Sequence, residues 1–186
     1  MQERRPVTPL IGVVAAGVVA LDQLAKWVVL RELDGGRVVD VVGSLRLRLV
    51  FNQGLAFGLG SRFTSLIALG AVAVVLVLLR NRHRVVGRVP TAALGLVVGG
   101  AVGNLLDRLL REGHGGLLGG AVVDFVDLQW WPVFNLADVA ITVGAVLLAL
   151  TAGREPSSTA AGPGSGSGAG AGAGADPAGT GPEGAS

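Results

Sequence analysis

The sequence is marked first by the residue types that it lacks. It has no cysteine and no tyrosine among 186 residues, and only 4% of its residues are aromatic and 15% charged. Without cysteine, disulfide bonds, thiolate metal ligands and a cysteine nucleophile are all excluded. Because a soluble domain carries about 25% charged residues, this composition, with a mean hydropathy of +0.63, favours a protein that lies in the lipid bilayer.

Charge and histidine are also too sparse for several functions. The formal net charge is only +2, and the arginines stand in short clusters between apolar runs, so we expect no nucleic-acid partner. His83 lies in an arginine-rich loop and His114 in a glycine-rich turn, so neither a Ser-His-Asp triad nor a metal site is indicated. The prediction is therefore a protein without a metal or another cofactor.

Apolar runs predict an all-α membrane protein with four transmembrane helices. Each run is close to the roughly 20 residues that cross about 30 Å of hydrocarbon. The runs cover about residues 9–30, 63–79, 91–110 and 133–152. Together they predict a transmembrane domain over residues 1–152. The first run is too long for a signal-peptide core and contains two ionisable residues, so it is expected to stay attached.

Two segments outside these runs have distinct patterns. Residues 37–58 are expected to form a β segment, because Leu45, Leu47 and Leu49 alternate with polar residues and follow a valine-rich run with a possible turn at Gly43 and Ser44. Residues 153–186 are rich in Gly, Ala, Pro and Ser and are predicted to be a disordered cytoplasmic tail.

The distribution of arginine indicates how the chain crosses the membrane. The loop from Arg80 to Arg88 holds four arginines and no acid, and Arg4 and Arg5 precede the first helix. Basic residues in short loops stay on the cytoplasmic side. Arginines also occur on the other side, for example at Arg46, but acidic residues accompany them there. We therefore expect both termini in the cytoplasm and the β segment outside it.

Ionisable residues inside the predicted helices are functional candidates, since each costs about 2.5 to 3.5 kcal/mol on insertion scales. Asp22 and Lys26 are four residues apart and share a helix face, where a structural ion pair explains them at least as well as a catalytic role. In the third helix, three glycines allow close helix contact, and Asn104, Asp107 and Arg108 follow on one face. That face must point into the bundle.

The last candidates lie near the start of the fourth helix. Asn135 and Asp138 are three residues apart in a run that is otherwise apolar, and Asp124 stands between Val123 and Phe125 in the preceding connection. An isolated carboxylate in such a connection is more often a solvated loop residue or a helix cap. Asp127 competes with Asp124 for any role at this position.

Several short blocks together resemble the bacterial lipoprotein signal peptidase (signal peptidase II) family. No single block is specific, but five in the family's order, on a four-helix hydropathy pattern, make a strong signal. The blocks are DQLAK at residues 22–26, NQGLAF at 52–57, GGAVGNLLDR at 99–108, VVDF at 122–125 and FNLAD at 134–138.

The resemblance implies a four-helix fold with a small extracytoplasmic sheet in the bacterial cytoplasmic membrane, and an active site that faces outward. It implies cleavage of prolipoproteins just before a cysteine that bears diacylglycerol, with membrane lipids as the other partners. The sequence leaves the oligomeric state open, and a monomer is the expectation. The family's catalytic aspartates correspond to Asp124 and Asp138. The implied supporting residues are Asn52, Gly54, Asn104, Asp107, Arg108 and Asn135, and the implied structural pair is Asp22 and Lys26.

Physical chemistry fits a pair of carboxylates. Two carboxyl groups that lie close together in a low-dielectric site share one proton, so one can activate water and the other can protonate the scissile carbonyl and the leaving amine. Two alternatives compete with this hypothesis. A small proton- or ion-coupled transporter would usually show repeat symmetry between its halves, and this sequence shows none. A membrane scaffold gives no reason for Asp107, Asp124 and Asp138 to gather at one end.

Overall fold

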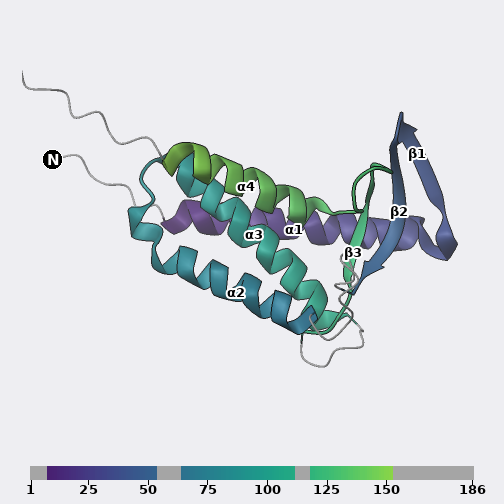
Figure 1. Cartoon of the computed structure of the whole chain (residues 1–186), viewed down its shortest axis with the longest axis horizontal. Coiled ribbons are helices and arrows are strands. Elements are labelled where there is room, and N and C mark those ends of the chain that lie inside the picture. The colour runs from purple at the N-terminus through teal and green to yellow at the C-terminus, as the bar shows by residue number, and fades with distance from the viewer. Residues whose placement is uncertain (1–7, 54–63, 112–117, 153–186) are drawn as a thin grey trace, which may run out of the picture. The chain divides into compact units, whose positions relative to one another are not determined.

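A computed structural model describes residues 8–53, 64–111 and 118–152 of the chain (Figure 1). Gly54, His114 and the predicted tail from residue 153 lie outside the described residues. The described part contains four α-helices, which are α1 (Thr8–Glu32), α2 (Thr64–Arg80), α3 (Arg88–Leu110) and α4 (Leu136–Ala152). Two 3₁₀ helices, Asp34–Gly36 and Arg82–Arg84, follow α1 and α2.

Glycines set the close packing of α3 against its neighbours α1 and α4. A Cβ atom on Gly99 would lie 2.8 Å from the Ala15 carbonyl oxygen of α1, and one on Gly100 would overlap the Ala137 carbonyl oxygen of α4. The predicted close contact at these glycines is therefore observed. Such backbone approach is how helices associate in lipid, where burial of apolar surface supplies no driving force between them.

The helices differ in length. Among the described residues, two are long and apolar enough to cross a membrane, Pro9–Glu32 and Arg88–Leu110. The apolar stretches Leu69–Arg80 and Leu136–Ala152 are shorter. With 17 residues each, α2 and α4 reach about 26 Å at 1.5 Å per residue.

A small antiparallel sheet lies at one end of the helices, where α1 extends alongside it (Figure 1). Its strands are β1 (Val38–Val42), β2 (Leu45–Asn52) and β3 (Val122–Asp127), in the order β1-β2-β3. The predicted turn joins β1 to β2, and Gly43 has a φ of 55°, which glycine adopts readily. The third strand is a correction, because the sequence indicated only a connection around Asp124.

The sheet rests on the end of α1. Phe125 of β3 forms a buried cluster with Val29 and Leu33 of α1, and Leu47 and Leu49 of β2 pack against it. The expected leucine face of the hairpin therefore covers a helix. A register shift between Leu47 and Val50 places Val50 opposite Asp124, so this bulge sets where the carboxylate stands on the sheet.

Candidate active site

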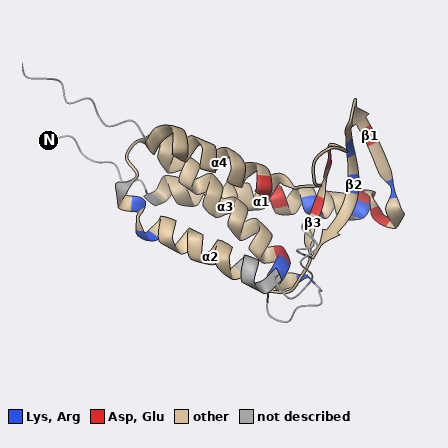
Figure 2. Cartoon of the chain, in the orientation of Figure 1, with Lys and Arg blue, Asp and Glu red and all other residues tan. Residues whose placement is uncertain are grey.

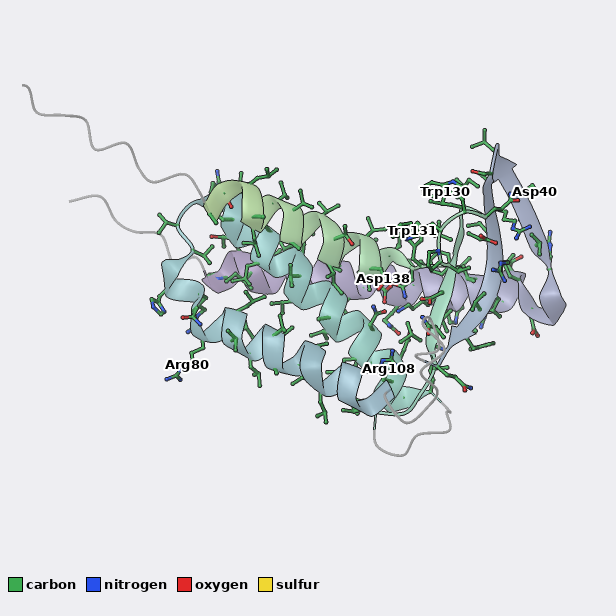
Figure 3. The ribbon with its side chains drawn as sticks, in the orientation of Figure 1. Asp40, Arg80, Arg108, Trp130, Trp131 and Asp138 are labelled. Carbon is green, nitrogen blue, oxygen red and sulfur yellow. The ribbon has the colours of Figure 1, made fainter. Side chains whose placement is uncertain are left out.

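The polar candidates of the helices meet where α4 begins, beside β3. Figure 2 shows the charged residues gathered mainly at the two ends of the helices, with several beside the sheet. In Figure 3, Asp138 and Arg108 lie at this sheet end, and Arg80 lies at the other end of the bundle. The site is thus made by residues that are far apart in the sequence.

Asp138 is held by the start of its own helix. Asn135 precedes α4, and its backbone N–H donates to Asp138 Oδ2 at 3.2 Å. In return, the Asp138 backbone N–H donates to Asn135 Oδ1 at 3.0 Å. These reciprocal bonds are a capping box, which satisfies N–H groups that the first helical turn leaves without partners. The cap therefore fixes the Asp138 side chain as well as the helix start.

Asp124 is buried between two amides. Asn52 Nδ2 donates to its Oδ2 at 2.9 Å, and Asn135 Nδ2 donates to its Oδ1 at 2.6 Å. Only 2% of Asp124 is exposed. Burial, and to a lesser degree the negative charge of Asp138, raise the pKa of Asp124 to about 6, although the two amide bonds oppose the change. The carboxyl can therefore gain or lose a proton near neutral pH.

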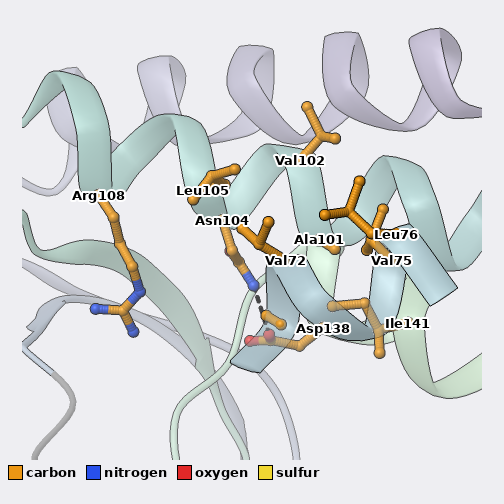
Figure 4. A pocket seen from close by; sticks show the side chains of 11 residues that line it. Val72, Val75, Leu76, Ala101, Val102, Asn104, Leu105, Arg108, Asp138 and Ile141 are labelled. Atoms are coloured by element: carbon orange, nitrogen blue, oxygen red, sulfur yellow. Dashed lines mark hydrogen bonds between the residues drawn. The ribbon is translucent and has the colours of Figure 1, made fainter. Parts of the chain in front are cut away.

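One asparagine joins the two carboxylates. Asn135 contacts Asp124 through its side chain and Asp138 through its backbone. Asn104 of α3 lies beside it, with its Nδ2 donating to Asp138 Oδ1 at 2.8 Å (dashed line in Figure 4) and its Oδ1 accepting from Asn135 Nδ2 at 3.1 Å. The structure thus brings Asn52, Asn104, Asn135, Asp124 and Asp138 into one hydrogen-bond network.

Asp22 and Lys26 lie directly behind this network and are fully buried. Lys26 Nζ lies 2.8 Å from Asp22 Oδ2 and 2.8 Å from Asp107 Oδ2, so the predicted pair is a triad. Asp22 Oδ1 also accepts the Ala137 backbone N–H at 3.0 Å, which ties α1 to the first turn of α4. This contact supports the predicted structural role of Asp22.

Asp107 links the buried charges to β3. Its Oδ2 accepts the Val123 backbone N–H at 3.1 Å, immediately before Asp124, and its Oδ1 accepts Arg111 Nε at 2.8 Å. Asp107 therefore holds the strand that carries Asp124. Sequence reasoning did not identify Arg111, although its spacing of four residues from Asp107 on a helix indicates such a pair.

Arg108 borders a crevice that opens beside Asp138. The crevice has a volume of about 270 Å³ between α2, α3 and α4, and Asn104, Arg108 and Asp138 are its polar residues (Figure 4). Its other walls are aliphatic: Ala71, Val72, Val75, Leu76, Ala101, Val102, Leu105 and Ile141. Arg108 Nη1 is buried and has no hydrogen-bond partner among the described residues.

Asp127 has a different environment from Asp124. Its Oδ2 accepts Arg46 Nε at 2.7 Å and Arg48 Nε at 2.5 Å, and its Oδ1 accepts the Gln129 backbone N–H at 2.8 Å. The two arginines, first Arg46 and then Arg48, hold the pKa of Asp127 at about 2. A carboxylate that stays ionised in this way suits the anchoring of a loop better than proton transfer.

The arrangement can bind a backbone and move a proton. Its amides offer donors and acceptors, and Asp124 titrates near neutral pH. Among the residues that the structure describes, no group of three or more His, Cys, Asp or Glu side chains could hold a metal ion. Gly54, the remaining predicted site residue, falls in the part of the chain that is not described.

Comparison with known proteins identifies the family of the chain. The model of the family described as signal peptidase (SPase) II matches residues 14–153. The chain is 42% identical over 156 residues to the lipoprotein signal peptidase of Rhodococcus jostii, which covers 82% of this chain and 78% of that protein. It is 40% identical over 138 residues to the lipoprotein signal peptidase of Mycobacterium avium, which covers 74% of this chain and 75% of that protein.

Two solved structures, each described as a bacterial membrane enzyme obtained by the in meso method, have the same fold. One, at 1.9 Å resolution, has a TM-score of 0.66 and 24% identity and covers 78% of this chain and 93% of its own. The other, at 2.3 Å, has a TM-score of 0.65 and 26% identity and covers 76% of this chain and 86% of its own. The match over residues 14–153 and the identities to curated relatives show that the chain belongs to the signal peptidase II family, the aspartic peptidases of family A8.

Proposed function

We propose that Asp124 and Asp138 are the catalytic pair with which this lipoprotein signal peptidase cleaves the signal peptides of prolipoproteins. The observation that carries the proposal is the position of Asn135, which contacts both carboxylates at once. Membership of the family removes the transporter alternative. The pKa of Asp124, about 6, supports a pair that holds one proton near neutral pH.

The chemistry follows from that shared proton. The ionised carboxylate takes a proton from a water molecule as the water oxygen attacks the scissile carbonyl carbon. The protonated carboxyl donates its proton to the carbonyl oxygen, which gives a tetrahedral intermediate. As its carbon–nitrogen bond breaks, the carboxyl that received the water proton passes it to the departing amine. A hydroxyl proton of the intermediate returns to the other carboxylate as the new carbonyl forms, so the pair again holds one proton. The hydrogen bonds from Asn52, Asn104 and Asn135 hold both groups in place throughout.

The crevice is proposed to receive the apolar part of the substrate. Its aliphatic walls lead from α2 to Asp138, so they suit the lipid chains of a diacylglyceryl-modified cysteine or the apolar core of the signal peptide. The buried Nη1 of Arg108 is a donor at the rim of this crevice, where a carbonyl oxygen of the substrate can pair with it.

The membrane topology is proposed from the two ends of the bundle. Arg80 marks the end opposite Asp138 (Figure 3), and its loop is expected on the cytoplasmic side. Trp130 and Trp131 are 71% and 59% exposed near the sheet end, where indole rings suit the headgroup region. We therefore place the sheet and the active site outside the cytoplasm and infer that α2 and α4 also span the membrane.

Cleavage of a diacylglyceryl-modified prolipoprotein by the purified protein tests the catalytic pair. Asp124→Asn and Asp138→Asn keep the side-chain shape and remove the ionisable group, so each is expected to lower kcat by a factor of roughly 100 to 10,000. Asp127→Asn is the matched control on the same sheet and should retain most of the activity. Full activity of either catalytic variant would contradict the pair.

A further inference from the structure

Lys26 carries a fully buried ammonium group that faces three acceptors. Its Nζ atom contacts Asp22 and Asp107 at 2.8 Å each and Asn104 Oδ1 at 3.0 Å. The two carboxylates compensate its charge. The third contact differs in kind, because the amide oxygen of Asn104 adds no compensating charge and belongs to the side chain that donates to Asp138.

An asparagine amide can be turned end for end with little change in shape, so its neighbours decide its orientation. Asn104 turns its oxygen to Lys26 and its NH₂ group to Asp138. In the reversed orientation, the NH₂ group would face an ammonium, which has no lone pair, and the amide oxygen would face a carboxylate oxygen. Because an ammonium group only donates, Lys26 permits one orientation of Asn104.

The same constraint passes to the next amide. The oxygen of Asn104 also accepts a bond from Asn135 Nδ2 at 3.1 Å, so Asn135 must present its NH₂ group there. That NH₂ group donates to Asp124 Oδ1 at 2.6 Å as well. The hydrogen bonds that the two carboxylates receive from these side chains therefore both depend on an orientation that begins at Lys26.

We propose that Lys26 is a positioning residue for the catalytic carboxylates. It holds the Asn104 amide with an N–H directed at Asp138. Through Asn135, it also sets an N–H that Asp124 receives. This role rests on the proposed function of the two aspartates and goes beyond the structural ion pair expected for Lys26.

Charge balance decides how the role can be tested. The charged groups around the two carboxylates are Asp22 and Lys26 of α1 and Asp107 and Arg108 of α3. Removal of Lys26 alone leaves two buried acids with one cation fewer, which is strongly destabilising. One acid must therefore be neutralised together with Lys26.

Three variants of the full chain separate positioning from structure. Asp22→Asn is the control, because it weakens the ion pair and leaves Lys26 beside Asn104. Asp22→Asn with Lys26→Met removes one charge of each sign and the donor. Asp22→Asn with Lys26→Gln returns an uncharged donor at the same position. Thermal unfolding reports whether each variant is folded.

The readouts are kcat, KM and the pH profile for cleavage of a diacylglyceryl-modified prolipoprotein, and an NMR titration of the ¹³Cγ signal of Asp124. We expect the Met variant to have a kcat on the order of 100-fold below the Asp22→Asn control, with KM little changed. Loss of the cation should also move the acidic limb of its pH profile and the Asp124 titration midpoint to higher pH. The Gln variant should recover part of kcat.

A double-mutant cycle tests whether the effect of Lys26 on kcat passes through Asn104. If Lys26 acts through Asn104, then Lys26→Met has little further effect on kcat in an Asn104→Ala background. A kcat of the Met variant equal to that of the control, or an equal loss in both backgrounds, overturns the proposal. If the Met variant does not fold, the same cycle is run with Lys26→Gln, and a loss of kcat that is equal in both backgrounds overturns the proposal.

The two proposals fail in different ways. A wild-type chain that does not cleave the prolipoprotein contradicts the proposed function. The NMR titration requires no activity and still reports whether Lys26 controls Asp124.

Discussion

The raised pKa of Asp124 predicts that this carboxyl lowers the stability of the folded protein at neutral pH. Its folded-state pKa is about 6 because of burial, against the ordinary value of 3.8 for an aspartic acid side chain. Between these values the folded state binds more protons than the unfolded state, so stability falls as the pH rises. The stabilising effect of the bound proton is fully present below the unfolded pKa and is lost as the pH passes the folded pKa.

The magnitude follows from the two pKa values. One pKa unit corresponds to about 1.36 kcal/mol, so ionised Asp124 lowers the free energy of unfolding by about 3 kcal/mol at pH 8. At pH 4 the same effect is only about 0.5 kcal/mol. Asp124→Asn cannot ionise, so its stability relative to the wild type should improve by about 2.5 kcal/mol between pH 4 and pH 8. Changes in hydrogen bonding to Asn52 and Asn135 that are the same at both pH values cancel.

The assay is unfolding of the purified protein in mixed micelles at several pH values, followed by circular dichroism. Relief of repulsion with Asp138 is already part of this gain, because that repulsion contributes to the raised pKa. Asp127→Asn is the control with the opposite sign, because the pKa of Asp127 is lowered to about 2. Its carboxylate stabilises the fold above the unfolded pKa, and this stability is lost as the pH falls toward 2. A gain for Asp124→Asn that does not change with pH, or that grows on acidification, would refute the reasoning.

Two further predictions concern packing and substrate binding. Gly100→Ala should destabilise the protein by about 1 to 3 kcal/mol, because the added Cβ would overlap the Ala137 carbonyl oxygen. Gly17→Ala is the control, because a Cβ there would have no other atom within 4 Å. It should be neutral or stabilising in the same unfolding assay. Arg108→Lys keeps the charge and loses the planar group, so KM for the prolipoprotein should rise roughly tenfold if this contact contributes about 1.4 kcal/mol. An unchanged KM would place the substrate elsewhere.

The apolar runs were sufficient to predict four helices, because such runs have few alternative structures in lipid. The alternation of leucines with polar residues predicted the hairpin of β1 and β2. The strand β3 was not predicted. Its sequence, Val-Val-Asp-Phe-Val-Asp, is rich in strand-forming residues. Its partner β2, however, lies about 70 to 80 residues earlier, and the pairing of Val50 with Asp124 depends on a bulge that no local pattern indicates.

The sequence predicted which residues form the candidate site, but not the hydrogen bonds that join them. Asn135 and Asp138 carry a local signal, since a capping residue three positions before an acid at the start of an apolar run indicates a capping box. The bond from Ala137 to Asp22 joins residues 115 positions apart, and the three contacts of Lys26 involve two helices. Such contacts depend on how the helices pack, which the sequence does not state.

In this network, uncharged N–H groups position the two catalytic carboxylates, and the buried cation of Lys26 lies one side chain farther away. All four oxygens of Asp124 and Asp138 accept hydrogen bonds from uncharged N–H groups, contributed by Asn52, Asn104 and Asn135. A lysine or arginine in direct contact would orient a carboxylate equally well, but it would favour the ionised form of both acids and oppose the shared proton. Neutral amides also favour the ionised form, but less strongly than a charged donor does, and burial outweighs them at Asp124. The ammonium of Lys26 contacts Asn104 instead of a catalytic carboxylate, and it orients the amides of Asn104 and Asn135 from there. Asp22 and Asp107 compensate its charge. This explains why Asn104 lies between Lys26 and Asp138.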